Sequence, residues 1–115
     1  LGGLDIAAMT GACLGAAAAR LPLLLDGFIS TVAALTAVRL CSGAEAALLA
    51  SHCSAEPAGK MLLDALGLSP LLCAGLRLGE GTGALAALPL FDMAMAMYGG
   101  AEFSSYGMDA YTPQN

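Results

Sequence analysis

The chain has 115 residues, of which 58% are hydrophobic and 11% are charged, and its formal net charge is -5. Its few cations form no basic stripe that could follow a nucleic acid backbone, so we do not expect nucleic acid as a partner. No apolar run reaches the roughly 18 residues that span a bilayer, so we expect no membrane segment. The apolar excess instead predicts a globular fragment whose apolar faces are covered by further chain.

The cysteines are scattered and form no Cys-x-x-Cys pair; they are Cys13, Cys41, Cys53 and Cys73. This distribution is typical of buried, reduced thiols in a cytoplasmic protein rather than of disulfides or metal ligands. We therefore expect no metal and no other cofactor. The opening residues 1–5 contain no targeting leader and are typical of the interior of a longer polypeptide, so we expect that its beginning is missing.

The first part of the chain predicts a helix followed by a strand. Residues 4–19 are rich in alanine and leucine and predict a buried helix, in which Gly11 and Gly15 form a small-residue face for close packing. Residues 21–26 form an apolar run that begins with Leu-Pro and is closed by Asp-Gly. This run predicts a parallel strand that is covered on both faces.

The middle of the chain continues the alternation. Ser30 or Thr31 can cap a helix that ends near Leu40. Residues 46–50 predict a second strand. Residues 57–67 then predict a helix that has proline at its first position and stops at a glycine.

The last part of the chain predicts one more strand and one more helix. Residues 71–73 form a third short strand, residues 79–83 a glycine-rich turn, and residues 84–98 a helix that Pro89 disturbs. Strands that alternate with helices predict an α/β fold of three layers, here part of a doubly wound parallel sheet with helices on both faces. Ligands bind such sheets at the carboxyl ends of the strands.

Three polar loops, at residues 26–28, 51–56 and 79–83, each follow a predicted strand and precede a helix. The fold therefore brings them to one edge, where helix N-termini attract phosphates, carboxylates and sugar hydroxyls. An anionic, nucleotide-like ligand fits this edge. Turn geometry and helix capping account for the same glycine, serine and aspartate residues equally well.

Glu80 lies between two glycines at the start of a predicted helix. A carboxylate that loses water when a site closes holds a proton more tightly and is suited to accept one from a nitrogen nucleophile. From spacing alone, however, complementing the helix dipole is the stronger explanation. The run Gly-Glu-Gly-Thr-Gly matches neither a dinucleotide-binding fingerprint nor a P-loop.

His52 is the only histidine, and we expect it to order its loop. A hydrolase triad needs a Gly-x-Ser-x-Gly elbow that the sequence lacks, and the adjacent Cys53 is a poor zinc co-ligand. Met93, Met95 and Met97 spread around a helix and are expected to fill gaps in a core or an interface.

Four short motifs carry a family resemblance over nearly the whole chain. They are Gly2-Gly3 with residues 6–8, Leu-Asp-Gly-Phe-Ile at 25–29, Ser51-His52 with residues 54–57, and Leu-Arg-Leu-Gly-Glu-Gly-Thr-Gly-Ala at 76–84. In order and spacing the chain resembles the nicotinate-nucleotide:dimethylbenzimidazole phosphoribosyltransferases of cobalamin assembly. The tail, residues 101–113, is similar to the family's ending.

The resemblance implies transfer of phosphoribose from nicotinate mononucleotide to 5,6-dimethylbenzimidazole, with inversion at the anomeric carbon. The products are alpha-ribazole 5'-phosphate and nicotinate. It implies that Glu80 is the proton acceptor, which favours the catalytic interpretation over the dipole interpretation. The substrate-binding positions it implies, around the ribose, phosphate and base, are Gly27, Phe28, Ser54, Leu78 and Gly79.

Family members extend far upstream, so the resemblance implies that this chain needs an upstream half to complete the site. Residues 1–98 are then the C-terminal half of the α/β domain, and residues 99–115 a tail that packs on the small helical region or on the partner in a homodimer. Cys53 and Cys73 stand where relatives have arginine and, in many cases, aspartate. Two alternatives stay open: a non-catalytic binding or assembly module, and phosphoribosyl transfer to another base or to a phenol.

Overall fold

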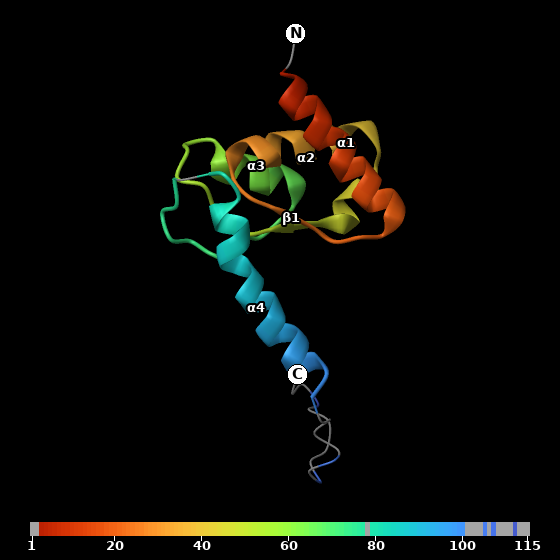
Figure 1. Cartoon of the computed structure of the whole chain (residues 1–115), viewed down its shortest axis with the longest axis vertical. Coiled ribbons are helices and arrows are strands. Elements are labelled where there is room, and N and C mark those ends of the chain that lie inside the picture. The colour runs from red at the N-terminus through yellow and green to blue at the C-terminus, as the bar shows by residue number, and fades with distance from the viewer. Residues whose placement is uncertain (1–2, 78, 101–104, 106, 108–111, 113–115) are drawn as a thin grey trace.

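The chain alternates helices with short strands. The computed structural model describes residues 3–77, 79–100, 105, 107 and 112. Its elements are, in chain order, α1 Leu4–Ala19, β1 Leu23–Leu25, α2 Phe28–Leu40, the 3-10 helix η1 Ala44–Ala47, β2 Leu48–Ala50, α3 Gly59–Leu66 and α4 Thr82–Tyr98. In Figure 1, α1, α2 and α3 lie above the strands, and α4 runs away below them.

The strands β1 and β2 form a parallel sheet, which confirms the predicted α/β class. Their register pairs Leu25 with Ala50 at the carboxyl ends. The third predicted strand, at residues 71–73, is reduced to a single parallel bridge between Leu72 and His52, because the chain bends directly after this segment. The described residues thus contribute two full strands to the sheet, and their carboxyl ends point toward the polar loops.

One apolar core joins α1, α2, α3 and both strands; its buried members are Cys13, Leu25, Ala34, Ala37, Leu48 and Leu66. Burial raises the pKa of the Cys13 thiol above its ordinary value. All four cysteines are free, but the prediction that all are buried was wrong, because Cys41 and Cys73 are exposed. Both lie outside the helices and strands, where the backbone runs over the surface.

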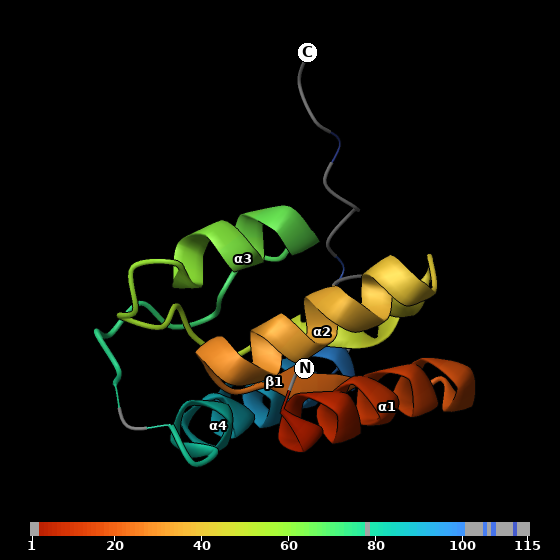
Figure 2. The ribbon, with the colours of Figure 1, turned by 90° about the horizontal axis from the view of Figure 1, so that it is seen from above.

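The helix α1 has the predicted bounds and lies alongside α2 (Figure 2). The buried Thr10 hydroxyl donates to the Ile6 carbonyl at 2.8 Å and lies 3.3 Å from the Ala33 carbonyl of α2. The predicted packing through Gly11 and Gly15 was wrong for the described chain, because a Cβ at either position meets no atom within 4 Å. The helix is therefore buried on the Thr10 face and not all round.

The helix α2 begins earlier than predicted. Its N-cap is Gly27, so Ser30 and Thr31 lie in the first turn and do not cap it. Their hydroxyls instead donate back to the Gly27 carbonyl, at 2.9 and 2.7 Å. The helix ends at Leu40, as predicted. An early start places the first turn of α2 directly against the end of β1.

The starts of β2 and α3 also differ from the predicted ones, because residues predicted to be in these elements lie in a 3-10 helix or a turn. The strand β2 begins at Leu48 and not two residues earlier, since η1 extends to Ala47. The helix α3 begins at Gly59, and Pro57 lies in the turn before it. The predicted end of α3 at Gly67 is confirmed by a left-handed C-cap with φ of 68°.

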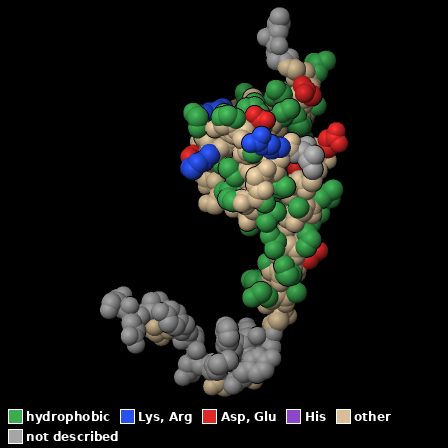
Figure 3. Space-filling model, turned by 90° about the vertical axis from the view of Figure 1, so that its left-hand side faces the viewer, with side chains coloured by type: hydrophobic (Ala, Val, Ile, Leu, Met, Phe, Trp, Pro, Cys, Tyr) green, Lys and Arg blue, Asp and Glu red, His purple; other side chains and the backbone are tan. Residues whose placement is uncertain are grey.

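The helix α4 begins two residues earlier than predicted and contains Pro89 without ending there. Exposed apolar side chains occur all round it, namely Leu85, Leu88, Leu90, Met93, Met95, Met97 and Tyr98. Figure 3 shows such side chains gathered along this helix. The three methionines therefore fill no core among the described residues, although a helix that is apolar on every side is typical of a protein interior. No helix in the described ranges is long and apolar enough to cross a membrane.

Candidate functional site

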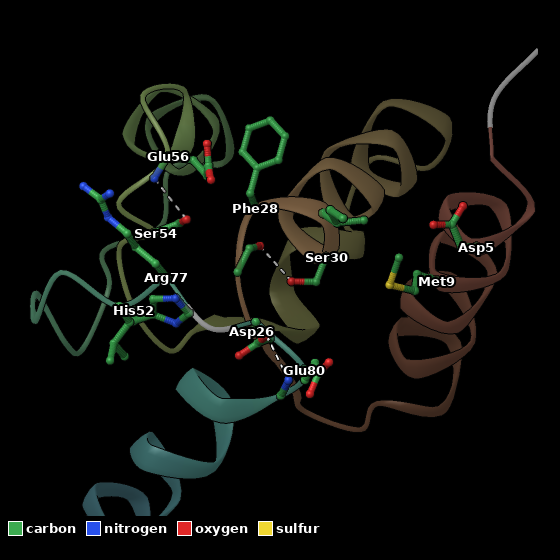
Figure 4. A pocket seen from close by; sticks show the side chains of 15 residues that line it. Asp5, Met9, Asp26, Phe28, Ser30, His52, Ser54, Glu56, Arg77 and Glu80 are labelled. Carbon is green, nitrogen blue, oxygen red and sulfur yellow. Dashed lines mark hydrogen bonds between the residues drawn. The ribbon is translucent and has the colours of Figure 1, made fainter.

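The three polar loops predicted to meet at the sheet edge do meet, around a pocket of about 540 Å³ (Figure 4). They reach it from the end of β1, from the end of β2 and from the segment before α4. The N-terminal part of α1 adds Asp5 and Met9 to the wall. Parallel strands bring their carboxyl ends to one edge, which is why residues far apart in sequence share this pocket.

Every predicted site residue that the structure describes lines this pocket: Gly27, Phe28, Ser54, Gly79 and Glu80. Leu78 lies outside the described residues. The Ser54 hydroxyl accepts a hydrogen bond from the Glu56 amide at 3.3 Å, so its own proton is available to a ligand. The structure brings these residues together, and their roles toward a substrate stay predictions.

Asp26 is a pocket residue whose contacts the sequence did not predict. One oxygen of its carboxylate accepts from the amides of Gly83 and Ala84, at 2.9 and 3.1 Å. The other accepts from the Gly81 amide at 3.0 Å. Asp26 thus caps α4 from the end of β1. An Asp-Gly pair after a strand and a distant glycine-rich helix start were both visible in the sequence, but nothing local joins them.

Every amide at the start of α4 has a hydrogen-bond partner. Besides the amides that Asp26 binds, Thr82 donates to the Gly79 carbonyl at 3.1 Å and Leu85 to the Gly81 carbonyl at 2.9 Å. An unpaired helix N-terminus attracts anions because its first amides have no internal partner. This helix end is therefore already occupied by a carboxylate of the chain itself.

Glu80 has a left-handed backbone, with φ of 57°, between Gly79 at 66° and Gly81 at 82°. A non-glycine residue in this region is disfavoured by about 1–2 kcal/mol, so surrounding contacts must hold it there. The Glu80 side chain is exposed at the pocket wall. The predicted desolvation of this carboxylate is therefore not provided by the described residues.

The His52 side chain, from the loop after β2, packs against residues of the other two loops. It is 5% exposed, and its Nδ1 lies 3.0 Å from the Ser51 Oγ, which itself donates to the Asp26 carbonyl at 3.0 Å. Because the Ser51 hydroxyl has only one proton and donates it to the Asp26 carbonyl, Nδ1 of His52 is the donor in the pair with Ser51. A Cβ on Gly83 would overlap the ring, and one on Gly27 would touch it.

Carboxylates outnumber cations on the described pocket wall. Asp5, Asp26, Glu56 and Glu80 line it, and Arg77 is the single lysine or arginine among the lining residues. An anionic ligand therefore depends on backbone amides, on Arg77 and on groups beyond the described chain. No group of three metal-ligating side chains occurs within the described ranges.

The start of α2 provides backbone amides that an anion could use. The amides of Phe28, Ile29 and Ser30 have no hydrogen-bond partner in the described part of the chain, whereas the Thr31 amide donates to the Gly27 carbonyl at 3.1 Å. All three residues line the pocket. Of the N-termini of α2 and α4, which both line this pocket, that of α2 is open and that of α4 is capped.

A parallel sheet with a pocket at its carboxyl edge, walled by helix N-termini, defines an α/β protein with the arrangement that this class uses for ligand sites. The family model described as "Phosphoribosyltransferase" matches residues 1–107. The chain therefore belongs to this phosphoribosyltransferase family.

Known proteins similar to the chain have a consistent name. A nicotinate-nucleotide–dimethylbenzimidazole phosphoribosyltransferase of Ruminiclostridium cellulolyticum is 47% identical over 98% of this chain and 32% of its own length. A protein of the same name from Pseudomonas putida is 54% identical over 86% of this chain and 28% of its own length. The crystal structure of the Thermus thermophilus protein of this name superimposes with a TM-score of 0.88 at 44% identity, covering 96% of this chain and 33% of that one.

The chain spans about a third of the length of the curated relatives that it matches. The helix α4 ends at Tyr98, as predicted, and the division of the chain into a domain portion and a tail after residue 98 stays a prediction. Most of the predicted tail, residues 99–115, lies outside the described residues, so its packing stays a prediction.

Proposed function

We propose that this chain is the C-terminal part of an enzyme that transfers phosphoribose from nicotinate mononucleotide to 5,6-dimethylbenzimidazole. The names of its relatives support this reaction. The single observation that carries the proposal for this chain is the location of Glu80, on the wall of a pocket built from the loops after β1 and β2 and the loop before α4. The products are alpha-ribazole 5'-phosphate and nicotinate.

In this reaction Glu80 is the proton acceptor. One nitrogen of the benzimidazole attacks the anomeric carbon of the ribose, and nicotinate leaves with the electrons of the broken C–N bond. The other nitrogen gives its proton to the Glu80 carboxylate, so the ribosylated base does not accumulate positive charge. The nucleophile and the leaving group occupy opposite faces of the sugar, which inverts the anomeric carbon.

The nucleotide phosphate binds at the N-terminus of α2, and Gly27, Phe28 and Ser54 lie around the phosphate and ribose. The open amides of Phe28 and Ile29 support this placement, because the N-terminus of α4 is already capped by Asp26. In this proposal Gly79 and Leu78 contribute to the binding of the base.

The rest of the enzyme comes from chain upstream of these residues. The shortage of cations on the described wall supports a phosphate site completed from elsewhere, and the exposed apolar side chains of α4 support a further covering layer. We propose a cytoplasmic homodimer in which residues 1–98 form the C-terminal portion of each α/β domain. The acceptor base rests on the relatives' names, so dimethylbenzimidazole has to be compared with other bases and with phenols in the same assay.

Replacing Glu80 with glutamine in the complete polypeptide tests the proton acceptor. Loss of a positioned general base lowers kcat by about 10²–10⁴-fold, while KM for both substrates changes little. The matched control is Glu45→Gln, because Glu45 is an exposed residue of η1 outside the pocket. An unchanged rate of alpha-ribazole phosphate formation in the Glu80 variant would falsify the assignment.

A further inference from the structure

The hydrogen bonds of Asp26 connect β1 to the loop that carries Glu80. We propose that Asp26 is a positioning residue that holds Glu80 on the pocket wall through its bond to the Gly81 amide. The inference rests on the proposed function of Glu80 as proton acceptor. Asp26 itself touches no reacting atom in this mechanism.

The Glu80 loop needs such a restraint because its backbone is in a disfavoured conformation. Gly79, Glu80 and Gly81 all have positive φ, and Glu80 is the one non-glycine residue of the three. Hydrogen bonds lie on both sides of it: the Gly81 amide is bound to Asp26 at 3.0 Å, and the Thr82 amide to the Gly79 carbonyl at 3.1 Å. Release of the Gly81 amide frees the peptide unit that directly follows Glu80.

Asp26 can act as a fixed point because its own backbone is anchored. Leu25, the residue before it, is paired with Ala50 in the sheet, and the Ser51 amide donates to the Leu25 carbonyl at 3.2 Å. The fully buried Ser51 hydroxyl then donates to the Asp26 carbonyl at 3.0 Å. The position of Glu80 is thus set by a strand end, and a site supported by rigid elements is held more closely than one on a free loop.

The two carboxylate oxygens of Asp26 have separable roles. One binds Gly83 and Ala84 inside the first turn of α4, and the other binds Gly81 beside Glu80. An asparagine keeps one oxygen for Gly83 and Ala84 and presents its NH₂ group to the Gly81 amide, where two donors cannot bond. Asp26→Asn therefore releases the Glu80 side of the cap and keeps the helix side.

Steady-state kinetics of the complete polypeptide measure the effect of this release. Displacing a catalytic group by about 1 Å can cost about 10²-fold in rate, so kcat of Asp26→Asn falls by about 10–10²-fold, while KM for both substrates stays within about threefold. The control is Asp64→Asn, because Asp64 is an exposed residue of α3 that pairs with Lys60 outside the pocket.

Amide hydrogen exchange reports the same change without turnover. In Asp26→Asn the Gly81 amide exchanges faster, and the Gly83 and Ala84 amides keep their protection. Loss of protection at all three positions means that α4 unwinds as a whole, which overturns the selective role. Asp26→Ala removes all three bonds and serves as the reference for that outcome.

A double variant separates this inference from the proposed function on which it rests. If Asp26 acts through Glu80, adding Asp26→Asn to Glu80→Gln leaves kcat within about twofold of the Glu80 variant alone. Losses that multiply, or a normal rate for Asp26→Asn when Glu80→Gln is slow, overturn the positioning role alone. A normal rate for Glu80→Gln overturns the proposed function and the inference with it.

Discussion

At the scale of single residues, the site is held together by a few contacts that tolerate little change. The imidazole of His52 is enclosed by the backbones of Gly27 and Gly83, and its Nδ1 is bound by Ser51. Gly83 does not have a positive φ; it is required because a side chain at this position would overlap the ring. His52 has no proposed role in the reaction, but its contacts fix the distance between the loops that carry the proposed site residues.

The close approach of His52 to Gly83 predicts that Gly83→Ala destabilises the complete polypeptide. The added methyl group has to displace a buried ring, and overpacking of this kind costs about 1–3 kcal/mol. Urea denaturation measures the change in the free energy of unfolding.

The double variant Gly83→Ala with His52→Ala is the control for this prediction. Truncation of the ring makes room for the methyl group, so the double variant is more stable than the sum of the single effects requires. Strictly additive effects would show that the two residues do not contact each other.

At the scale of elements, regular segments could be predicted where the deciding interactions are local. The bounds of α1, the last residue of α2 and the glycine end of α3 follow from runs of helix formers and from helix stop residues. The prediction of a third strand at residues 71–73 was wrong, because a short apolar run forms a full strand only where a partner pairs with it along its length, and here one bridge forms. Early starts at α2 and α4 have a related cause, since these helices begin at glycines and not at a local capping side chain.

Some parts of the candidate site could be predicted from the sequence and others could not. The convergence of the three loops could be predicted, so their pocket residues could be named from the sequence, whereas the contribution of Asp5 and Met9 from α1 could not. The cap on α4 could not, because Asp26 and Gly81 are 55 positions apart and neither has a local partner that indicates the other. The exposure of the Glu80 side chain could not be predicted either, because it depends on whether further polypeptide covers the pocket, and no pattern within these residues indicates that.

The apolar surface of α4 leads to a prediction at this scale. If further chain covers the helix, Met93→Gln costs the complete polypeptide about 1–3 kcal/mol of unfolding free energy, because a buried amide replaces a thioether. Met93 is 56% exposed in the described chain, so these residues alone predict almost no cost. Urea denaturation distinguishes the two values.

Asp92→Asn is the matched control for the Met93 substitution. Asp92 is the exposed neighbour of Met93 on α4, and surface substitutions of this type change stability by less than about 0.5 kcal/mol. A Met93 variant as stable as the Asp92 variant would mean that this side of α4 stays in solvent.

At the scale of the whole molecule, the described residues form a two-stranded sheet with helices packed on it and with apolar side chains left exposed. The chain spans about a third of the relatives it matches, it has two full strands in the described ranges, and apolar side chains face outward along α4. A fold of this kind is stabilised by layers packed on both faces of the sheet. The pocket likewise needs groups from outside the described residues to bind an anion, because its described wall contains a single arginine.

We therefore predict that the isolated chain forms no alpha-ribazole phosphate and that activity appears when the upstream portion is supplied, either joined to it or as a separate polypeptide. The assay follows product formation by chromatography in mixtures of the two parts. Mixtures that contain the Glu80→Gln chain are the control and should stay inactive. Turnover by the isolated chain would contradict the prediction and show that these residues hold a complete site.

The cap of Asp26 on α4 also has a consequence for the order of folding. The strands β1 and β2 and the helix between them are near neighbours in sequence, whereas the cap closes a loop of 55 residues. Contacts between distant residues form slowly, because the chain loses entropy before the contact repays it. We therefore expect the bond between Asp26 and the loop that carries Glu80 to form after β1 has paired with β2, so that the sheet is in place before the proposed catalytic carboxylate.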